Sequence, residues 1–223
     1  MDARLRVVCI NLDERPDRWA NMERRLAGLS QTCSVSRMSA RTPETITRDA
    51  LSYLSRRQNA CAQSHYDAWK AFAEDSQEDA LLLLLEDDVL FKRGWYEELE
   101  QFVQRLDVEE PTKHVFFLNA SEDGPRELYR CRDQYLTGAT LYTRRGVAWL
   151  LSEFASCLAA SDQMTKALQD HSPCFCSFPW LAIQDGSLST IQGGMPTADQ
   201  AKVWRLLATA GLGEEYTPAA RPP

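Results

Sequence analysis

Three acidic residues, Glu86, Asp87 and Asp88, directly follow a run of five leucines that extends from Leu81 to Leu85. So apolar a run is typical of a strand buried on both faces, and open α/β sheets bind ligands at the carboxyl ends of such strands. Three carboxylates this close repel one another unless a cation lies among them. The motif therefore predicts a divalent-metal site that holds a phosphorylated ligand. The alternative is a strand-to-loop turn with solvated acids.

A second group of polar residues lies at the end of the first predicted strand, residues 6–12. Asn11 and Asp13 are suited to hydrogen-bonding a base or a ribose, and Arg15 or Arg18 to contacting a phosphate. The alternative interpretation is the surface start of a helix with ordinary ion pairing.

The charge distribution agrees with the first interpretation of both groups. The net charge is −7, but residues 1–70 carry 12 Lys and Arg against 8 Asp and Glu, whereas residues 71–130 carry 6 against 16. An arginine-rich element that faces an acidic metal site would hold a nucleoside diphosphate between them. Because the chain lacks a basic stripe with interleaved aromatic residues, nucleic acid is not expected as a partner.

Histidine and cysteine residues offer weaker signals. His65 lies on the apolar side of a predicted helix, where a core histidine is the alternative to a ligand-pocket residue. Cys174 and Cys176, near His171, lack the spacing of a zinc site, so they are interpreted as packing residues. The seven cysteines show no disulfide framework and predict free thiols in a reducing compartment, by default the cytoplasm.

Strands that alternate with helices must position these groups. The pattern predicts an α/β three-layer sandwich with a parallel first pair of strands. The predicted strands are residues 6–12, 33–38, 81–85, 114–118, 134–142 and 180–183, and the predicted helices are residues 16–28, 55–74, 95–106, 144–154 and 198–212.

The length of 223 residues suits one large domain with a tail. No stretch approaches the ~20 apolar residues that a membrane-spanning helix needs, and the N-terminus shows no signal-peptide pattern. We expect one domain over residues 1–197, followed by a C-terminal helix and a flexible tail over residues 198–223.

Five segments, in order and in spacing, resemble glycosyltransferase family 25, which includes bacterial lipooligosaccharide galactosyltransferases and collagen hydroxylysine galactosyltransferases. The resemblance covers residues 5–195. The segments are Asn11-Leu12-Asp13-x-Arg15-x-Asp17-Arg18, Cys61-Ala62-x-Ser64-His65-x-x-x-Trp69, Leu85-Glu86-Asp87-Asp88-Val89, Thr137-Gly138-Ala139-x-x-Tyr142-x-x-Arg145-Gly146, and Pro179 through Gln184 to Ser189-x-Ile191.

The resemblance implies a GT-A-type three-layer α/β/α sandwich with a mostly parallel central sheet. It implies a metal-dependent enzyme that moves a sugar, most often galactose, from a UDP-sugar to a glycan, glycolipid or protein hydroxyl with inversion. The nucleotide-sugar half would be residues 1–130, and the acceptor-side half residues 131–197.

The resemblance also implies roles for single residues. Asp87 and Asp88 would bind Mn²⁺ or Mg²⁺, and Glu86 would support them or contact the ribose. Asp162 or Asp185 would be the base that takes the proton of the acceptor hydroxyl. The remaining donor-binding candidates are Asn11, Leu12, Asp13, Arg15, Arg18, Ser64 and His65.

Two departures from the family pattern leave alternatives open. The acidic motif reads Glu-Asp-Asp instead of a strict Asp-x-Asp, and Thr190 stands where the family often has Asp. One alternative is an inactive family-like domain that serves as a binding or adhesion module, although buried acids without a use are costly. A metal-dependent phosphohydrolase is the other, but it needs a nucleophile or a two-metal cluster that the sequence does not reveal.

Overall fold

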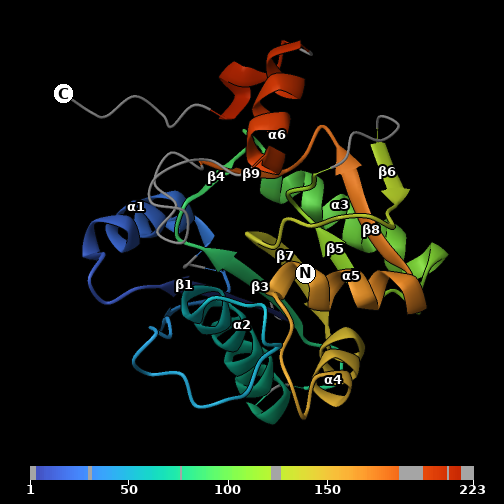
Figure 1. Ribbon diagram of the computed structural model, residues 1–223. Helices are drawn as coiled ribbons and strands as arrows, with labels where there is room; N and C mark the ends of the chain where they lie inside the picture. The colour runs from blue at the N-terminus through green and yellow to red at the C-terminus, as the bar shows by residue number, and fades with distance from the viewer. Residues whose placement is uncertain are drawn as a thin grey trace.

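The computed structural model places helices on both faces of one central sheet, which confirms the predicted α/β three-layer sandwich of GT-A type (Figure 1). The predicted family element at Ser189 and Ile191, including Thr190, lies outside the described residues, as does the predicted tail after residue 216. The structure describes residues 4–29, 32–75, 77–121, 127–185, 198–209 and 211–216.

Seven strands form the central sheet: β1 (Leu5–Asn11), β2 (Ser34–Ser39), β3 (Leu81–Glu86), β5 (Val115–Phe117), β6 (Glu127–Arg130), β7 (Ala139–Thr143) and β8 (Cys174–Phe178). Their order is β2-β1-β3-β7-β5-β8-β6. Strand β1 pairs in parallel with β2 and β3, and β5 pairs in parallel with β8, whereas β7 and β6 run against their neighbours. The sheet is therefore mostly parallel, as expected.

Strand β3 lies inside the sheet and is buried on both faces, as its leucine run predicts. Successive side chains of a strand point to opposite faces. Leu82 and Leu84 accordingly pack into the core on one face, and Leu83 and Leu85 pack into the core on the other. The two cores hold β3 in place, so the acids that follow it begin at a rigid point.

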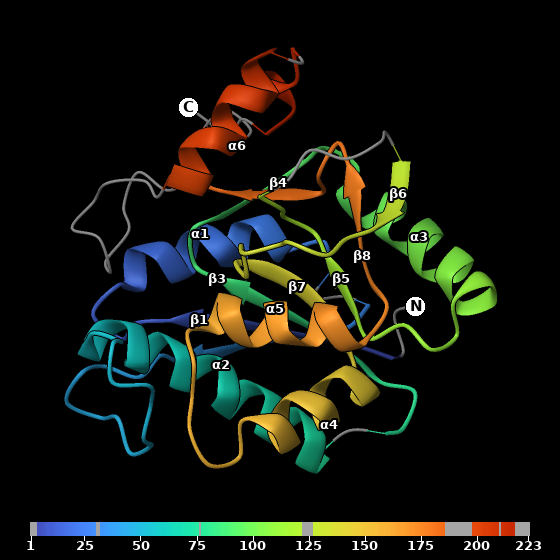
Figure 2. The same ribbon diagram turned by 45° about the vertical axis from the view of Figure 1, so that its right-hand side comes forward.

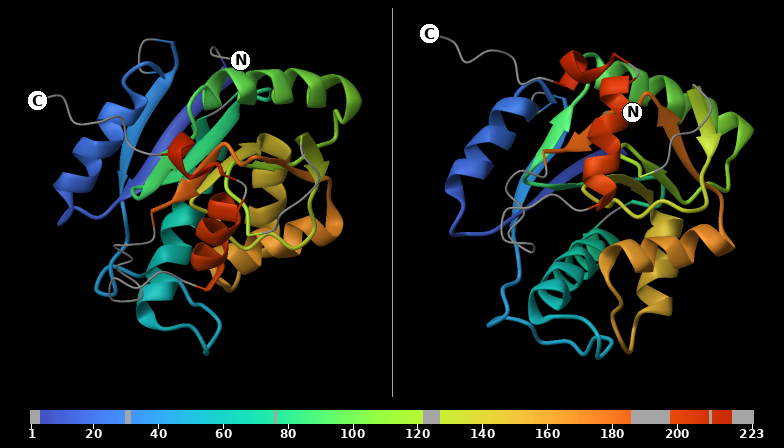
Figure 3. Two further views of the ribbon diagram at one scale, coloured as in Figure 1. Left: turned by 90° about the horizontal axis from the view of Figure 1, so that it is seen from above. Right: turned by 45° about the horizontal axis from the view of Figure 1, so that its top comes forward.

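The helices divide between the two faces of the sheet (Figures 2 and 3). Helix α1 begins with Pro16 at its first position, where proline suits a helix start, and it buries Met22 and Leu26 four residues apart. One face carries α1 (Pro16–Leu26) and α3 (Trp95–Glu109), and the other carries α2 (Arg56–Asp75), α4 (Arg144–Glu153) and α5 (Ser161–His171).

A short antiparallel ribbon, β4 (Val89–Phe91) with β9 (Ala182–Gln184), begins directly after the acids. Its pairing places Val89 opposite Gln184, and the Asp185 amide donates to the Asp88 carbonyl at 2.9 Å. The ribbon therefore brings a late segment of the chain next to the acidic motif.

Helix α6 (Ala198–Thr209) and the 3₁₀ turn η3 (Gly213–Tyr216) lie beside this ribbon (Figures 1 and 2). The buried Tyr216 hydroxyl donates to the Trp180 carbonyl. Val203 and Leu207 are buried in the same core as residues of α2. Helix α6 thus packs on the domain, while the predicted division of the chain at residue 197 stays a prediction.

Four strands and one helix depart from the sequence interpretation. The predicted strand 134–142 begins only at Ala139, because Gln134 instead bonds through its backbone to the Gln169 side chain. Elements β4, β6, β8 and α5 were not predicted. Strand β8 is short and mixes Cys and Ser with aromatic residues, which hides its alternation. Its Cys174 and Cys176 are fully buried, so their interpretation as packing residues is confirmed.

Candidate functional site

Asp87 turns toward β1 and α1, and both of its carboxylate oxygens are engaged. Arg18 donates from Nη1 to Oδ1 at 2.8 Å, and Asn11 donates from Nδ2 to Oδ2 at 2.7 Å. The Arg18 and Asp87 side chains are only 7% and 11% exposed, so this ion pair is largely shielded from water. Asn11 also accepts a hydrogen bond from Arg37 Nε at 2.7 Å. The predicted nucleotide-binding Asn11 and Arg18 thus lie together with Asp87.

Glu86 and Asp88, two residues apart, converge on one amide group. Gln184 donates from Nε2 to Glu86 Oε2 at 3.0 Å and to Asp88 Oδ1 at 3.3 Å. Burial, together with the charges of Glu86 and Asp87, raises the pKa of Asp88 to about 7. Oxygen ligands suit Mn²⁺ and Mg²⁺, and a cation would relieve the repulsion that raises this pKa. The donor set formed by Glu86 and Asp88 therefore fits a hard divalent cation.

Gly138 makes room for the Gln184 side chain. A Cβ atom at Gly138 would lie 2.4 Å from Cδ of Gln184, closer than real Cβ contacts come. Asn119 donates to Gln184 Oε1 at 3.4 Å and accepts from the Ala139 amide at 2.9 Å. The group that comes close to this glycine is therefore a side chain.

His65 lies behind Glu86 and is buried. Its Nε2 atom is 3.1 Å from Glu86 Oε1, and its ring meets the Trp69 ring edge-on at 6.1 Å between centroids. Cys61 completes a group whose potential ligand atoms all lie within 4.8 Å of one another. Burial raises the pKa of the Cys61 thiol, with a smaller contribution from Glu86. His65 thus contacts the Glu86 carboxylate from within the core.

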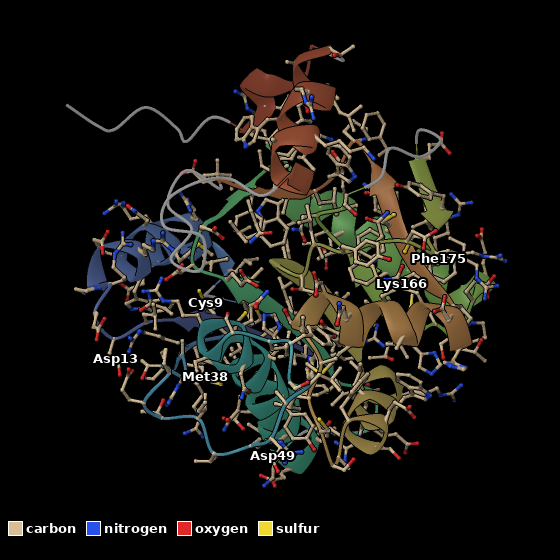
Figure 4. All side chains as sticks on the ribbon, in the orientation of Figure 1. Cys9, Asp13, Met38, Asp49, Lys166 and Phe175 are labelled. Atoms are coloured by element: carbon tan, nitrogen blue, oxygen red, sulfur yellow. The ribbon has the colours of Figure 1, made fainter. Side chains whose placement is uncertain are left out.

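Asp13, Arg15 and Leu12 lie outside this cluster. Asp13 is exposed at the rim of the sheet, where hydrogen bonds from Ser39 and Arg37 lower the pKa of its carboxyl (Figure 4). Arg15 forms a two-bond pair with Asp17 at 2.7 and 2.9 Å. The Leu12 carbonyl accepts from the Arg15 amide at 2.9 Å. Their predicted roles in donor binding stay predictions.

Ser64 faces the loop that precedes α2. Its hydroxyl donates to the Ala60 carbonyl and accepts from the Arg41 amide, both at 2.8 Å. The side chain is 1% exposed, so these two bonds show it as an anchor of that loop. Its predicted contact with the donor remains untested.

The two candidate bases approach the acids from different elements. Asp162 lies in the first turn of α5, and its charge contributes to raising the pKa of Cys61. Beside it, Ser161 Oγ lies 4.0 Å from Cys61 Sγ. Asp185 follows β9 and is joined by its backbone to Asp88. Asp185 therefore borders the carboxyl end of β3, and Asp162 lies near Cys61, which shares a cluster with Glu86.

Gln184 and Arg25 lie in the site, but no role was predicted for either of them. Arg25 donates from Nη1 to the Val89 carbonyl at 2.6 Å. Burial lowers the pKa of its guanidinium, and the charges of Asp185 and Asp88 oppose this effect. The signal for Arg25 was the N-terminal excess of arginine. The signal for Gln184 was its place in the last segment of the family resemblance.

Comparisons with known proteins agree with this geometry. A search of curated proteins found no match. The family model described as glycosyltransferase family 25 (LPS biosynthesis protein) matches residues 5–125, which is more than half of the 223 residues. The matched segment contains the Asn11, His65 and Asp88 positions described above. Within the described residues no helix is long and apolar enough to cross a membrane. The chain belongs to glycosyltransferase family 25 and is a glycosyltransferase.

Proposed function

We propose that this glycosyltransferase moves a sugar, galactose by family resemblance, from a UDP-sugar to a hydroxyl of a glycan, glycolipid or protein, with inversion. We further propose that it depends on Mn²⁺ or Mg²⁺. The observation that carries the proposal is the convergence of Glu86 and Asp88 on Gln184 at the carboxyl end of β3. That edge of an α/β sheet is where phosphorylated ligands bind.

In this proposal Asp88 and Glu86 hold the metal. Glu86 takes the place that the family resemblance assigns to Asp87, because the Asp87 carboxylate is already paired with the Arg18 guanidinium, whereas Glu86 and Asp88 meet at the Gln184 amide. When bound, the cation neutralises the departing diphosphate. Asp87 fixes the Arg18 guanidinium, which lies beside the acids and is positioned for a phosphate oxygen. His65 keeps the Glu86 carboxylate oriented.

An inverting transfer needs a base in line with the departing diphosphate. We assign this role to Asp162 in preference to Asp185. Asp162 lies at the start of α5, beside Ser161, whose Oγ atom is 4.0 Å from Sγ of Cys61 in the cluster with Glu86. Asp185 is held to Asp88 by a backbone bond and lies on the metal side of the site. The acceptor hydroxyl would then approach from the side of α5.

We place the reaction in the reducing cytoplasm as part of the same proposal. All seven cysteines are free thiols in the structure, and four of them are buried. Free thiols in this number are typical of a compartment that keeps cysteine reduced.

Isothermal titration of UDP with and without Mn²⁺ tests the donor site. We expect Mn²⁺ to strengthen UDP binding to the wild-type protein. In Asp88→Asn, the increase in UDP affinity that Mn²⁺ causes should be at least about tenfold smaller, because a charged ligand is removed. Glu109→Gln, on an exposed pair of α3, is the matched control and should bind as the wild type does. Metal-dependent binding that is unchanged in Asp88→Asn rejects the assignment. UDP-galactose hydrolysis, measured in parallel, reports activity.

A further inference from the structure

Three exposed apolar side chains lie in segments that border α5. Among the described residues, four large apolar side chains are exposed, and three of them, Leu51, Tyr53 and Tyr135, lie in segments that contact α5 or the residues just before it. The fourth, Val108, lies on α3. Single exposed apolar residues are ordinary on a protein surface, so what matters is which elements hold each of these side chains in place.

Contacts with α5 place each of the three. The Leu51 amide donates to the Leu158 carbonyl at 2.8 Å, just before the helix. The Tyr53 hydroxyl donates to the side chain of Gln163, in the first turn. Tyr135 belongs to a stretch that runs along α5, because the hydroxyls of Thr137 and Ser161 lie 3.3 Å apart and Gln134 bonds to Gln169.

The loop that carries Leu51 and Tyr53 is fixed to the domain at several points. Gln63 on α2 accepts from the Thr47 amide at 2.9 Å, and Arg41 pairs with Asp67 at 2.7 Å. The Arg48 guanidinium lies over the Tyr66 ring at 4.1 Å. So many anchors hold the loop in one shape. Tyr53 nevertheless remains 61% exposed at its end, so the loop presents this ring to solvent.

A chain of contacts joins Tyr53 to the acids of the proposed donor site. Gln163, which accepts from Tyr53, is next to Asp162, and Ser161 lies beside Cys61. Cys61 in turn shares a cluster with His65 and Glu86. Tyr53 therefore lies several side chains away from the reacting atoms, on the side from which we expect the acceptor to approach.

From this arrangement we propose that residues 49–54 and the first turn of α5 form an acceptor subsite for a carbohydrate. The inference rests on the proposed function and adds the class of acceptor. A pyranose has an apolar C–H face, which suits an aromatic ring, and a rim of hydroxyls, which suits nearby amide, hydroxyl and carboxylate groups. Tyr53 provides the ring, and Gln163, Asp162 and Ser161 provide polar groups. The ring stacks on a sugar that lies beyond the unit carrying the acceptor hydroxyl.

An array of immobilised oligosaccharides, probed with the protein alone and with UDP and Mn²⁺, tests the subsite directly. We expect the wild-type protein to bind at least one glycan. Tyr53→Ala should bind that glycan about tenfold more weakly, because an aromatic anchor is lost, and Tyr53→Phe should stay close to wild type. Val108→Ala, which changes an exposed residue on α3, is the control and should be unchanged.

Steady-state transfer from UDP-galactose to the bound glycan gives a second readout. Tyr53→Ala should raise the acceptor KM about tenfold while kcat, the donor KM and UDP-galactose hydrolysis stay near wild type. Leu51→Ser, on the same loop, should raise the acceptor KM to a smaller extent. These two variants change exposed side chains, so we expect both to fold.

Three results overturn the subsite. They are a wild-type protein that binds no glycan under either condition, a Tyr53→Ala protein that binds glycans as the wild type does, and transfer to a peptide hydroxyl with a KM that Tyr53→Ala leaves unchanged. Failure of the donor proposal is distinct, because it appears as absent UDP binding in the wild-type protein. The array with protein alone does not depend on the donor.

Discussion

Gly138 and Gln184 occupy neighbouring space so closely that a single added carbon at Gly138 would lie 2.4 Å from the Gln184 amide carbon. Gln184 uses this space to reach Glu86 and Asp88 with one nitrogen. Gly138 lies directly before β7. Because it has no side chain, Gln184 has the space from which it contacts the Glu86 and Asp88 carboxylates.

Gly138→Ala should disturb the acids without touching them. The added carbon displaces Gln184, and we expect about 1–3 kcal/mol of lost stability together with weaker Mn²⁺-dependent UDP binding. Urea unfolding and isothermal titration measure the two effects. Gly28→Ala is the matched control, because an added Cβ there meets nothing within 4 Å. If Gly138→Ala binds UDP and Mn²⁺ as well as Gly28→Ala does, Gln184 does not position the acids.

Arg18→Met should be among the most destabilising changes on α1. It leaves the shielded Asp87 carboxylate without its cation, which costs about 3–5 kcal/mol when a buried pair is broken. The comparison is Arg15→Met, which breaks an exposed pair and should cost about 1 kcal/mol or less. Urea unfolding at neutral pH measures both. Equal losses for the two variants would show that the Arg18 pair is not shielded.

Asp88→Asn should have a pH-dependent effect on stability. The folded pKa of Asp88 is about 7, above its ordinary unfolded value of about 4, so the folded state binds the extra proton between these pH values. Stability from this group therefore falls as pH rises from about 4 to about 7. Without metal, we compare the free energy of unfolding of Asp88→Asn with that of the wild type. We expect this difference to favour the variant by on the order of 2 kcal/mol more at pH 8 than at pH 5. Urea unfolding in a chelator measures this, and an equal difference at both pH values contradicts it.

Tyr216 should anchor the C-terminal segment to the ribbon that carries Gln184. Tyr216→Phe leaves the buried Trp180 carbonyl without its donor and should cost about 1–3 kcal/mol. Tyr216→Ala also removes a buried ring and should cost about 3–5 kcal/mol. Thermal or urea unfolding compares them with Val108→Ala, an exposed change that should stay within about 0.5 kcal/mol. If Tyr216→Ala is as stable as the wild-type protein, η3 does not stabilise the domain.

Local patterns were sufficient to predict the frame of the fold. Five consecutive leucines predict β3, and Pro16 followed by apolar residues three and four apart predicts α1. These signals lie within one element, so burial on two faces or one helical stripe is visible in the sequence. Strands β4 and β6 span three and four residues, too few for an alternation to show, and they depend on partners distant in the chain.

The sequence predicted which residues belong to the candidate site, but not which of their side chains contact one another. Asn11, Arg18 and the three acids were all selected from their position at strand ends. Asp87 contacts Arg18, whereas its neighbours Glu86 and Asp88 contact Gln184. These contacts join residues that are 69 to 98 positions apart in the sequence. No local pattern encodes such contacts, because they are set by the packing of whole elements.

The ribbon of β4 and β9 also has a consequence for the order in which the protein is made. Asp88 and Gln184 are separated by 96 positions, so ribosomal synthesis releases every acid of the motif long before the amide that aligns two of them. A nascent chain that ends before β9 contains Glu86 and Asp88 without the amide that joins them. The proposed donor site is thus completed late, when the segment that carries β9 has folded back onto the end of β3.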